Sequence, residues 1–99
     1  MASLSHLNDA GPAPAVIDIE SETVRNENFR TTVWTGAHSQ TTLMVVQPGD
    51  DIGLEIHNDH DQFLRIEAGV GRAEMGPAAD PLQTWDVSHG FAVFVPAGQ

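Results

Sequence analysis

Cysteine is absent from this chain of 99 residues, and its absence excludes several kinds of function. Disulfide scaffolds, thiolate nucleophiles and iron–sulfur clusters all require cysteine. Any metal ion must therefore be held by nitrogen and oxygen atoms of His, Asp, Glu, Gln or Asn side chains.

Basic residues are scarce as well. The chain has no lysine and 4 arginines, against 14 aspartates and glutamates, and its formal net charge is -10. This charge repels phosphate backbones and anionic lipids, so neither nucleic acid nor a membrane surface is expected as a partner. Solubility is the simplest role for the charge. Attraction of a divalent cation is the alternative, and it requires a specific site.

Long apolar runs are also missing, since no stretch approaches the ~18–20 residues that span a bilayer. Residues 1–15 lack the basic start and the apolar core of a signal peptide, so we expect a cytoplasmic protein. These residues are rich in small side chains, Gly and Pro, and they predict a flexible arm. Residues 16–99 then form one small domain.

The sequence does contain short β-branched and aromatic segments with a period of two. Glycine and proline turns separate them, and Pro48-Gly49-Asp50-Asp51 gives the strongest turn signal. Residues 21–28 resemble a helical turn, although they lack a sustained apolar stripe. The pattern predicts an all-β antiparallel sandwich or barrel. Its strands are expected at residues 16–20, 29–35, 41–47, 52–57, 62–68, 70–75, 82–88 and 91–95.

Candidate metal ligands lie near the middle of the chain. Glu55 and His57 are two residues apart on an expected strand, so both side chains point to one face. A tight connection at residues 58–61 lets the next strand pair with this one as a hairpin, which brings Gln62 close to His57. A divalent cation satisfies such a buried set, and Fe, Mn, Ni, Co, Cu and Zn all remain open. The alternative for a Glu-x-His strand is a solvated face without metal.

Two motifs in the second half of the chain resemble those of the cupin superfamily. The run Pro48-Gly49-(x5)-Glu55-x-His57-(x4)-Gln62-(x6)-Gly69 is similar to the first motif, G-(x)5-H-x-H-(x)3,4-E-(x)6-G. Glu55 replaces the usual first His, and Gln62 replaces the usual Glu. The run Gly90-(x5)-Pro96-x-Gly98 resembles the start of the second motif, and the chain stops at Gln99, before the His of that motif.

The resemblance implies a fold, a site and a class of ligand. The fold is a small antiparallel jelly-roll barrel that lacks its last strand or strands, as in a cupin truncated within the second motif. Glu55, His57 and Gln62 become the metal ligands, and the lost fourth ligand weakens the affinity. Unpaired strand edges invite a partner chain, so we expect a homodimer or a poorly behaved fragment.

The same resemblance leaves the activity open. In the family the metal binds substrate oxygens or dioxygen, and this implies dioxygenase or isomerase and epimerase chemistry on a small organic molecule. No residue stands out as a nucleophile or a dedicated base. A non-catalytic module that binds or senses a small molecule is the alternative. A further alternative is a partial chain whose structure depends on strands from a partner.

Several other side chains have two interpretations. His60, in the connection after His57, is close enough to reach a metal, but loops favour exposed histidines. His6, His38 and His89 are expected at the surface. Five aromatic and aliphatic strand residues are expected to pack in the core or to line the barrel, namely Trp34, Met44, Leu64, Trp85 and Phe94.

Overall fold

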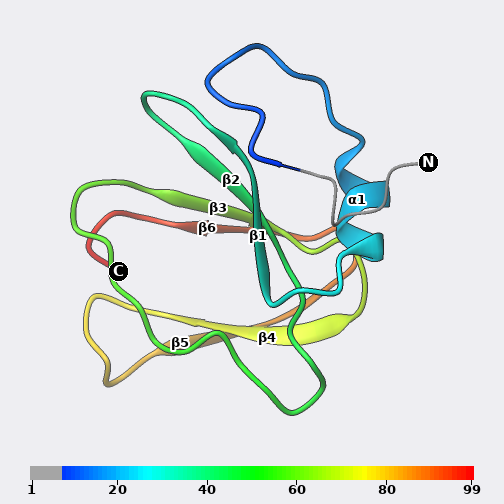
Figure 1. The fold of residues 1–99 in the computed structure, drawn as a ribbon. Helices are drawn as coiled ribbons and strands as arrows, with labels where there is room; N and C mark the ends of the chain where they lie inside the picture. Colours follow the sequence, from blue (N-terminus) through cyan, green and yellow to red (C-terminus); the bar gives the residue numbers. More distant parts are fainter. Residues whose placement is uncertain (1–7) are drawn as a thin grey trace. The chain divides into compact units, whose positions relative to one another are not determined.

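The computed structural model describes residues 8–99, so His6 and the first half of the predicted arm lie outside the described residues. The chain divides into a first unit, Met1–Asp51, and a second unit, Ile52–Gln99 (Figure 1). The described residues form six strands, one short helix and three two-stranded antiparallel sheets. The prediction of an antiparallel all-β chain is thus confirmed. The elements are α1 (Ile19–Arg25), β1 (Arg30–Thr35), β2 (Gln40–Met44), β3 (Gln62–Arg65), β4 (Val70–Met75), β5 (Gln83–Ser88) and β6 (Ala92–Val95).

The first unit is built on the hairpin of β1 and β2. Their register shifts between Thr32 and Trp34, so Val33 forms a β-bulge without an opposite residue. Val33 is fully buried, and Leu43 on β2 is 3% exposed. These two side chains form the core of this unit.

The described part of the predicted arm is hydrogen-bonded to β1. Ala10 N donates to Val33 O at 2.9 Å, and this carbonyl belongs to the bulge residue, which has no partner in the β1–β2 register. Trp34 Nε1 donates to Ala13 O at 2.8 Å. The Thr35 hydroxyl donates to the Asp9 carboxylate, which also accepts the Gly11 N–H at 2.9 Å. Residues 9–13 are therefore tied to one strand by main-chain and side-chain hydrogen bonds.

Helix α1 corrects one predicted strand. Residues 16–20 were expected to be extended, but the helix begins at Ile19 and continues through most of the segment that resembled a helical turn. Asp18 is its N-cap and accepts the Ser21 N–H at 3.1 Å. Acidic residues in the first turn and Arg25 in the last turn interact favourably with the helix dipole. The cap and these charges favour the helix, and the alternation of residues 16–20 is too short to outweigh them.

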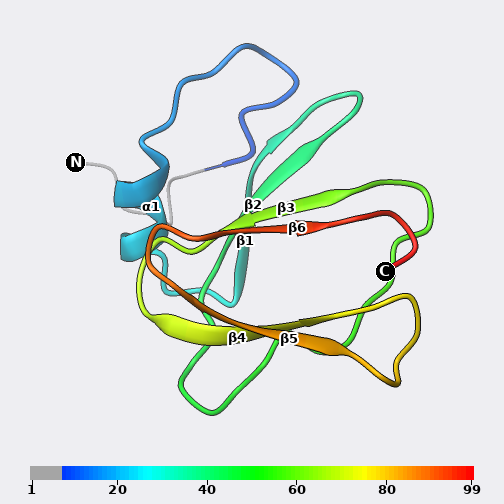
Figure 2. The same ribbon diagram turned by 180° about the vertical axis from the view of Figure 1, so that it is seen from behind.

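The second unit is one long antiparallel hairpin with a bend. β3 pairs with β6 at the open end of the hairpin, and β4 pairs with β5 beside its turn (Figure 2). Between the partners Arg65–Ala92 and Val70–Ser88 one segment advances five residues and the other four, so the bend holds one extra residue. Ile66 and Gly69 continue the pairing through the bend, with hydrogen bonds of 2.8–3.0 Å to residues 89–91.

The predicted hairpin between residues 52–57 and β3 is wrong. β3 pairs with β6, with Gln62 opposite Val95, and residues 52–57 form neither a helix nor a strand. Gly53 has a φ of 92°, which a regular strand does not adopt. Leu54 and Ile56 are both exposed, so no core face holds this segment in a ladder.

Other predictions fare better. The turn at residues 48–51 is confirmed, because Asp50 N donates to Gln47 O at 2.9 Å and Gly49 has a φ of 87°. β4 has the predicted bounds. Two of the expected core residues are exceptions, since Phe94 is 67% exposed and Trp85 is 43% exposed. None of the described helices is long and apolar enough to cross a membrane.

The burial of Leu43 predicts a large effect of truncation. Leu43→Ala leaves a cavity in the core of the first unit and should destabilise it by about 2–3 kcal/mol. Leu54→Ala makes the same chemical change at a side chain that is 69% exposed, and it should change stability by less than about 0.5 kcal/mol. Urea unfolding followed by tryptophan fluorescence measures both, and equal losses would contradict the assignment of the core.

The hydrogen bonds to Asp9 predict a shifted titration. The Thr35 hydroxyl and the Gly11 N–H hold the pKa of the Asp9 carboxyl below its ordinary value of 3.8. The carboxylate therefore favours the tied arm above that value, and this contribution disappears as the pH falls through the lowered pKa. Thr35→Val should raise the pKa of Asp9 toward 3.8, as measured by carboxyl NMR. Thr84→Val, on β5, should leave it unchanged.

Candidate functional site

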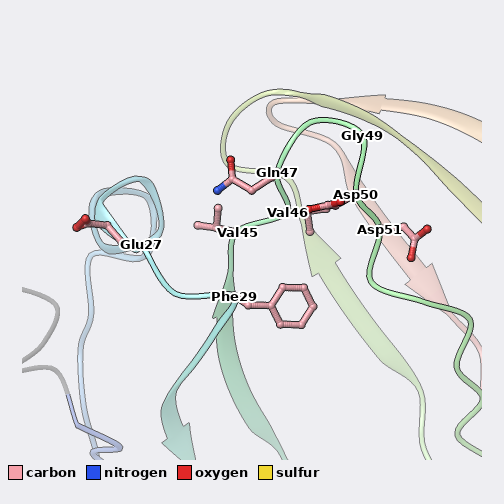
Figure 3. A pocket seen from close by; sticks show the side chains of 8 residues that line it. All are labelled: Glu27, Phe29, Val45, Val46, Gln47, Gly49, Asp50 and Asp51. Atoms are coloured by element: carbon pink, nitrogen blue, oxygen red, sulfur yellow. The ribbon is translucent and has the colours of Figure 1, made fainter.

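A hollow of about 440 Å³ lies in the first unit, beside the end of β2 and the turn that follows (Figure 3). Val45, Val46 and Phe29 give it apolar walls, and Glu27, Asp50 and Asp51 give it an acidic rim. None of the ligands predicted from the sequence lies here. Carboxylates that line an open hollow are usual on a chain of such acidity.

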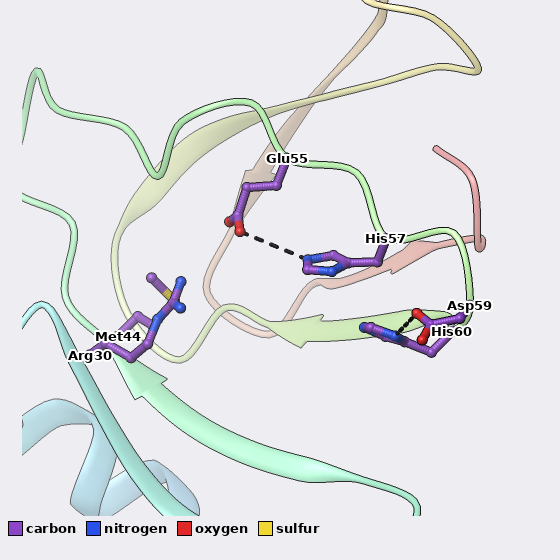
Figure 4. Close-up of polar contacts among 6 residues, drawn as sticks. All are labelled: Arg30, Met44, Glu55, His57, Asp59 and His60. Carbon is purple, nitrogen blue, oxygen red and sulfur yellow. Dashed lines mark hydrogen bonds and ion pairs between the residues drawn. The ribbon is translucent and has the colours of Figure 1, made fainter.

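The predicted ligands Glu55 and His57 do meet in the second unit. Glu55 Oε1 lies 3.8 Å from His57 Nε2, as expected for side chains two residues apart in an extended segment (Figure 4). Their side chains are 43% and 33% exposed, so solvent reaches the pair. The two residues share a face although they do not belong to a strand.

His60 lies beside His57 and is joined to Asp59. Its ring centroid is 4.7 Å from that of His57, with an angle of 36° between the ring planes. His60 Nδ1 lies 2.7 Å from Asp59 Oδ1, and this hydrogen bond is the main cause that holds the pKa of the Asp59 carboxyl below 3.8. An imidazole bonded to a carboxylate through one nitrogen has its orientation fixed and its other nitrogen turned outward.

The segment that carries these side chains is anchored to the chain after β6. Gly98 N donates to His57 O, and Ala97 N donates to Asp61 Oδ1, both at 2.8 Å. Gly98 itself has a φ of 87°, within a turn closed by Gln99 N and Pro96 O. The Pro-x-Gly sequence therefore holds the backbone of the candidate site, a role that its spacing alone did not reveal.

Gln62, the third predicted ligand, occupies the first position of β3 and is partly buried. The ladder that was expected to bring it to His57 does not form, because Gln62 pairs with Val95. Within residues 8–99 no three His, Asp or Glu side chains gather into a group able to hold a metal. Any ion bound by Glu55 and His57 must complete its coordination with neutral donors, such as the Gln62 amide or water.

The distance between Glu55 and His57 fits a shared ion. Imidazole nitrogens and carboxylate oxygens bind divalent transition metals at roughly 2.0–2.2 Å, so two atoms on one ion lie up to about 4.4 Å apart. The 3.8 Å separation falls within this limit. The donor set of one carboxylate and one imidazole suits a borderline divalent cation.

Sequence reasoning missed Glu67, in the bend after β3. Its side chain is 4% exposed and pairs with Arg65, with 3.1 Å between Nε and Oε2. The other oxygen, Oε1, is buried without a hydrogen-bond partner. A buried carboxylate of this kind is unfavourable unless paired, so the arginine is essential to its placement. The signal available was a Glu two residues after the arginine, at the expected end of a strand.

Comparison with known proteins gives relatives of similar sequence and structure. No family model matches the chain. A Bacillus halodurans protein, whose crystal structure was determined at 1.41 Å resolution, is 51% identical and superposes with a TM-score of 0.90. The match covers 92% of this chain and 70% of that one. The chain belongs to the same family as this Bacillus halodurans protein. The shared fold thus extends through both units, each of which is described above on its own.

Two curated proteins of similar sequence are longer than this chain. The uncharacterized protein YrkC of Bacillus subtilis is 50% identical over 93 residues, which are 93% of this chain and 50% of YrkC. An uncharacterized protein of Acanthamoeba polyphaga mimivirus is 36% identical over 83 residues, which are 84% of this chain and 51% of its own length. The chain therefore spans about half the length of these two relatives, and their names state no activity.

The anchor at Asp61 can be tested by amide hydrogen exchange. Asp61→Asn replaces a charged acceptor by a neutral one, and it should weaken the bond to Ala97 N by about 1 kcal/mol. The exchange of the Ala97 amide should become about fivefold faster. Asp59→Asn removes the same charge two residues away and should leave Ala97 unchanged. Equal acceleration in both variants would show that charge alone, and not the hydrogen bond, protects this amide.

Proposed function

We propose that the second unit binds one divalent transition metal at Glu55 and His57 and presents it to a small organic molecule. The observation that carries this proposal is the 3.8 Å approach of the Glu55 carboxylate to the His57 imidazole. In this proposal Gln62 supplies a neutral oxygen ligand. The proposal also implies the fold of the cupins, which is a jelly-roll barrel. The bent antiparallel hairpin of the second unit supports that assignment of fold.

The residues of the chain have separate tasks in such a site. Glu55 and His57 hold the ion, and Gly98 N fixes the backbone of His57 through its carbonyl. Asp59 orients His60, whose ring lies beside that of His57. When bound, a metal of this kind supplies Lewis acidity or redox chemistry toward substrate oxygens. Dioxygenase and isomerase or epimerase reactions are the proposed classes.

A non-catalytic module that binds or senses a small molecule is the second candidate. It is favoured by the ligand set, because one carboxylate and one imidazole leave most coordination positions to neutral donors. The affinity of such a set is modest. The wide exposure of Glu55 and His57 also admits solvent, whereas catalytic metal sites are commonly shielded from it.

Metal stoichiometry tests the proposal. The 99-residue chain, loaded separately with iron, manganese, nickel and zinc and then desalted, should retain about one ion per chain by elemental analysis. Glu55→Ala and His57→Ala should each weaken binding by more than the roughly 10- to 100-fold that the loss of an outer-sphere partner causes. Gln62→Ala should weaken it less, because water replaces a neutral donor.

Matched variants separate this site from the general acidity of the chain. Glu74→Ala, on β4, and His38→Ala, in the first unit, remove the same side chains elsewhere and should leave the stoichiometry unchanged. Retained binding in Glu55→Ala and His57→Ala, or no binding by the original chain with any of the four metals, would refute the metal site. Bound metal without turnover of candidate diols, phenols or sugars would favour the sensing module.

A further inference from the structure

The segment after β6 lies beside the loop that leads into β3 (Figures 1 and 2). Two hydrogen bonds of 2.8 Å join them, one from Gly98 N to His57 O and one from Ala97 N to Asp61 Oδ1. These two bonds hold both ends of the loop. We call residues 96–99, which form the turn after β6, the clasp.

His57 belongs both to the candidate site and to the contact with the clasp. Its imidazole lies 3.8 Å from the Glu55 carboxylate, and its carbonyl accepts the Gly98 N–H. Residues 52–57 form neither a helix nor a strand, so no ladder fixes the backbone there. The hydrogen bond from the clasp takes the place of a ladder, and it fixes the direction in which the imidazole leaves the chain.

The clasp is held weakly compared with the strands. Asp61 and Ala97 are both exposed, and exposed hydrogen bonds of this kind open at a low free energy. Gly98 has a φ of 87°, which other residues adopt only with strain. A side chain at this position would meet no other atom within 4 Å, so the constraint on Gly98 lies in its backbone conformation alone. Opening of the clasp is therefore easier than opening of the β3–β6 ladder.

We propose that the clasp positions His57 to bind a metal ion, and that ion binding in turn closes the clasp. This inference rests on the proposed metal site at Glu55 and His57. An ion held by both side chains favours the arrangement that brings them together, and the clasp favours the same arrangement. Two events that favour one conformation are coupled, and each strengthens the other by the same factor. Asp61 and Gly98 thus act through His57 and are positioning residues, not ligands.

Amide hydrogen exchange measured by NMR tests the coupling from the side of the clasp. Zinc is the probe, because it is diamagnetic and leaves the signals sharp. In the 99-residue chain with zinc bound, the Ala97 and Gly98 amides should exchange about fivefold more slowly, or slower still, than in the zinc-free chain. The Gly36 amide, which is bonded to Ser39 O in the turn between β1 and β2, is the internal control and should keep its rate.

Zinc titration of variants tests the coupling from the side of the ion. Gly98→Val combined with Asp61→Ala strains the turn and removes the acceptor of Ala97 N. This pair should raise the zinc dissociation constant about fivefold, which is the factor expected for the exchange.

Gly90→Val combined with Asp86→Ala is the matched control. Gly90 has a φ of 89° and open space around a new side chain, and Asp86 is an exposed carboxylate on β5. The control imposes the same strain and removes the same charge away from the clasp, so it should leave the dissociation constant unchanged.

A conservative variant separates positioning from a general loss of structure. Asn adopts a positive φ more readily than Val does. Gly98→Asn should therefore bind zinc more tightly than Gly98→Val, although both variants add a side chain at the same open position.

Three results would overturn the clasp. Zinc that binds without slowing exchange at Ala97 and Gly98 would overturn it and leave the metal site intact. An equal loss of affinity in the Gly90→Val, Asp86→Ala control would do the same. No binding of zinc would overturn the clasp, and no binding of iron, manganese or nickel either would overturn the proposed function with it.

Discussion

The bent pairing of residues 62–75 with residues 83–95 is the constraint on which the second unit depends. It sets β3 beside β6, and so it decides which side chains share a face and which chain segment borders the candidate site. The extra residue lies in the bend between the β3–β6 pair and the β4–β5 pair. Across this bend Ile66 and Gly69 keep their hydrogen bonds to residues 89–91. Because strand faces alternate, a different register would exchange the exposed and the partly buried residues of β3.

The same pairing explains how the candidate ligands are held without a strand of their own. Residues 52–57 have no ladder, yet Gly98 and Ala97, which follow β6, bond to both ends of the connection that contains His60. The end of one strand thus supports the site in place of a neighbouring strand. The backbone of His57 is held by a hydrogen bond from Gly98 N, in the segment that follows β6. This support is consistent with a site whose side chains remain partly open to solvent.

Local features of the sequence predicted local features of the structure. The predicted turn at Pro48-Gly49 is present, and Gly49 adopts the positive φ that this turn requires. The β4 segment has the bounds that its composition indicated. The helical turn indicated at residues 21–28 overlaps helix α1, but the start of the helix was missed because its cap at Asp18 lies in a short alternating segment. The facing of Glu55 and His57 also followed from the sequence, since it depends only on the two-residue spacing.

Pairing partners were beyond the reach of such reasoning. The tight connection after His57 favours a local hairpin, and the choice of β6 as the partner of β3 depends on contacts distant in sequence. Exposure of Phe94 follows from the same long-range choice, because an aromatic strand residue alone indicates burial. The approach of Gln62 to His57 was inferred from the wrong ladder. Its part in a metal site therefore remains a proposal.

The bulge at Val33 has a consequence for how the length of β1 can change. Its extra residue supplies both the most deeply buried side chain of the first unit and the carbonyl that accepts the Ala10 N–H. Deletion of Val33 would close the bulge, make Thr32–Thr42 and Trp34–Thr41 consecutive pairs, and remove both the buried side chain and this attachment of the arm. Insertions and deletions among family members should therefore gather in the turn between β1 and β2, and spare β1 itself.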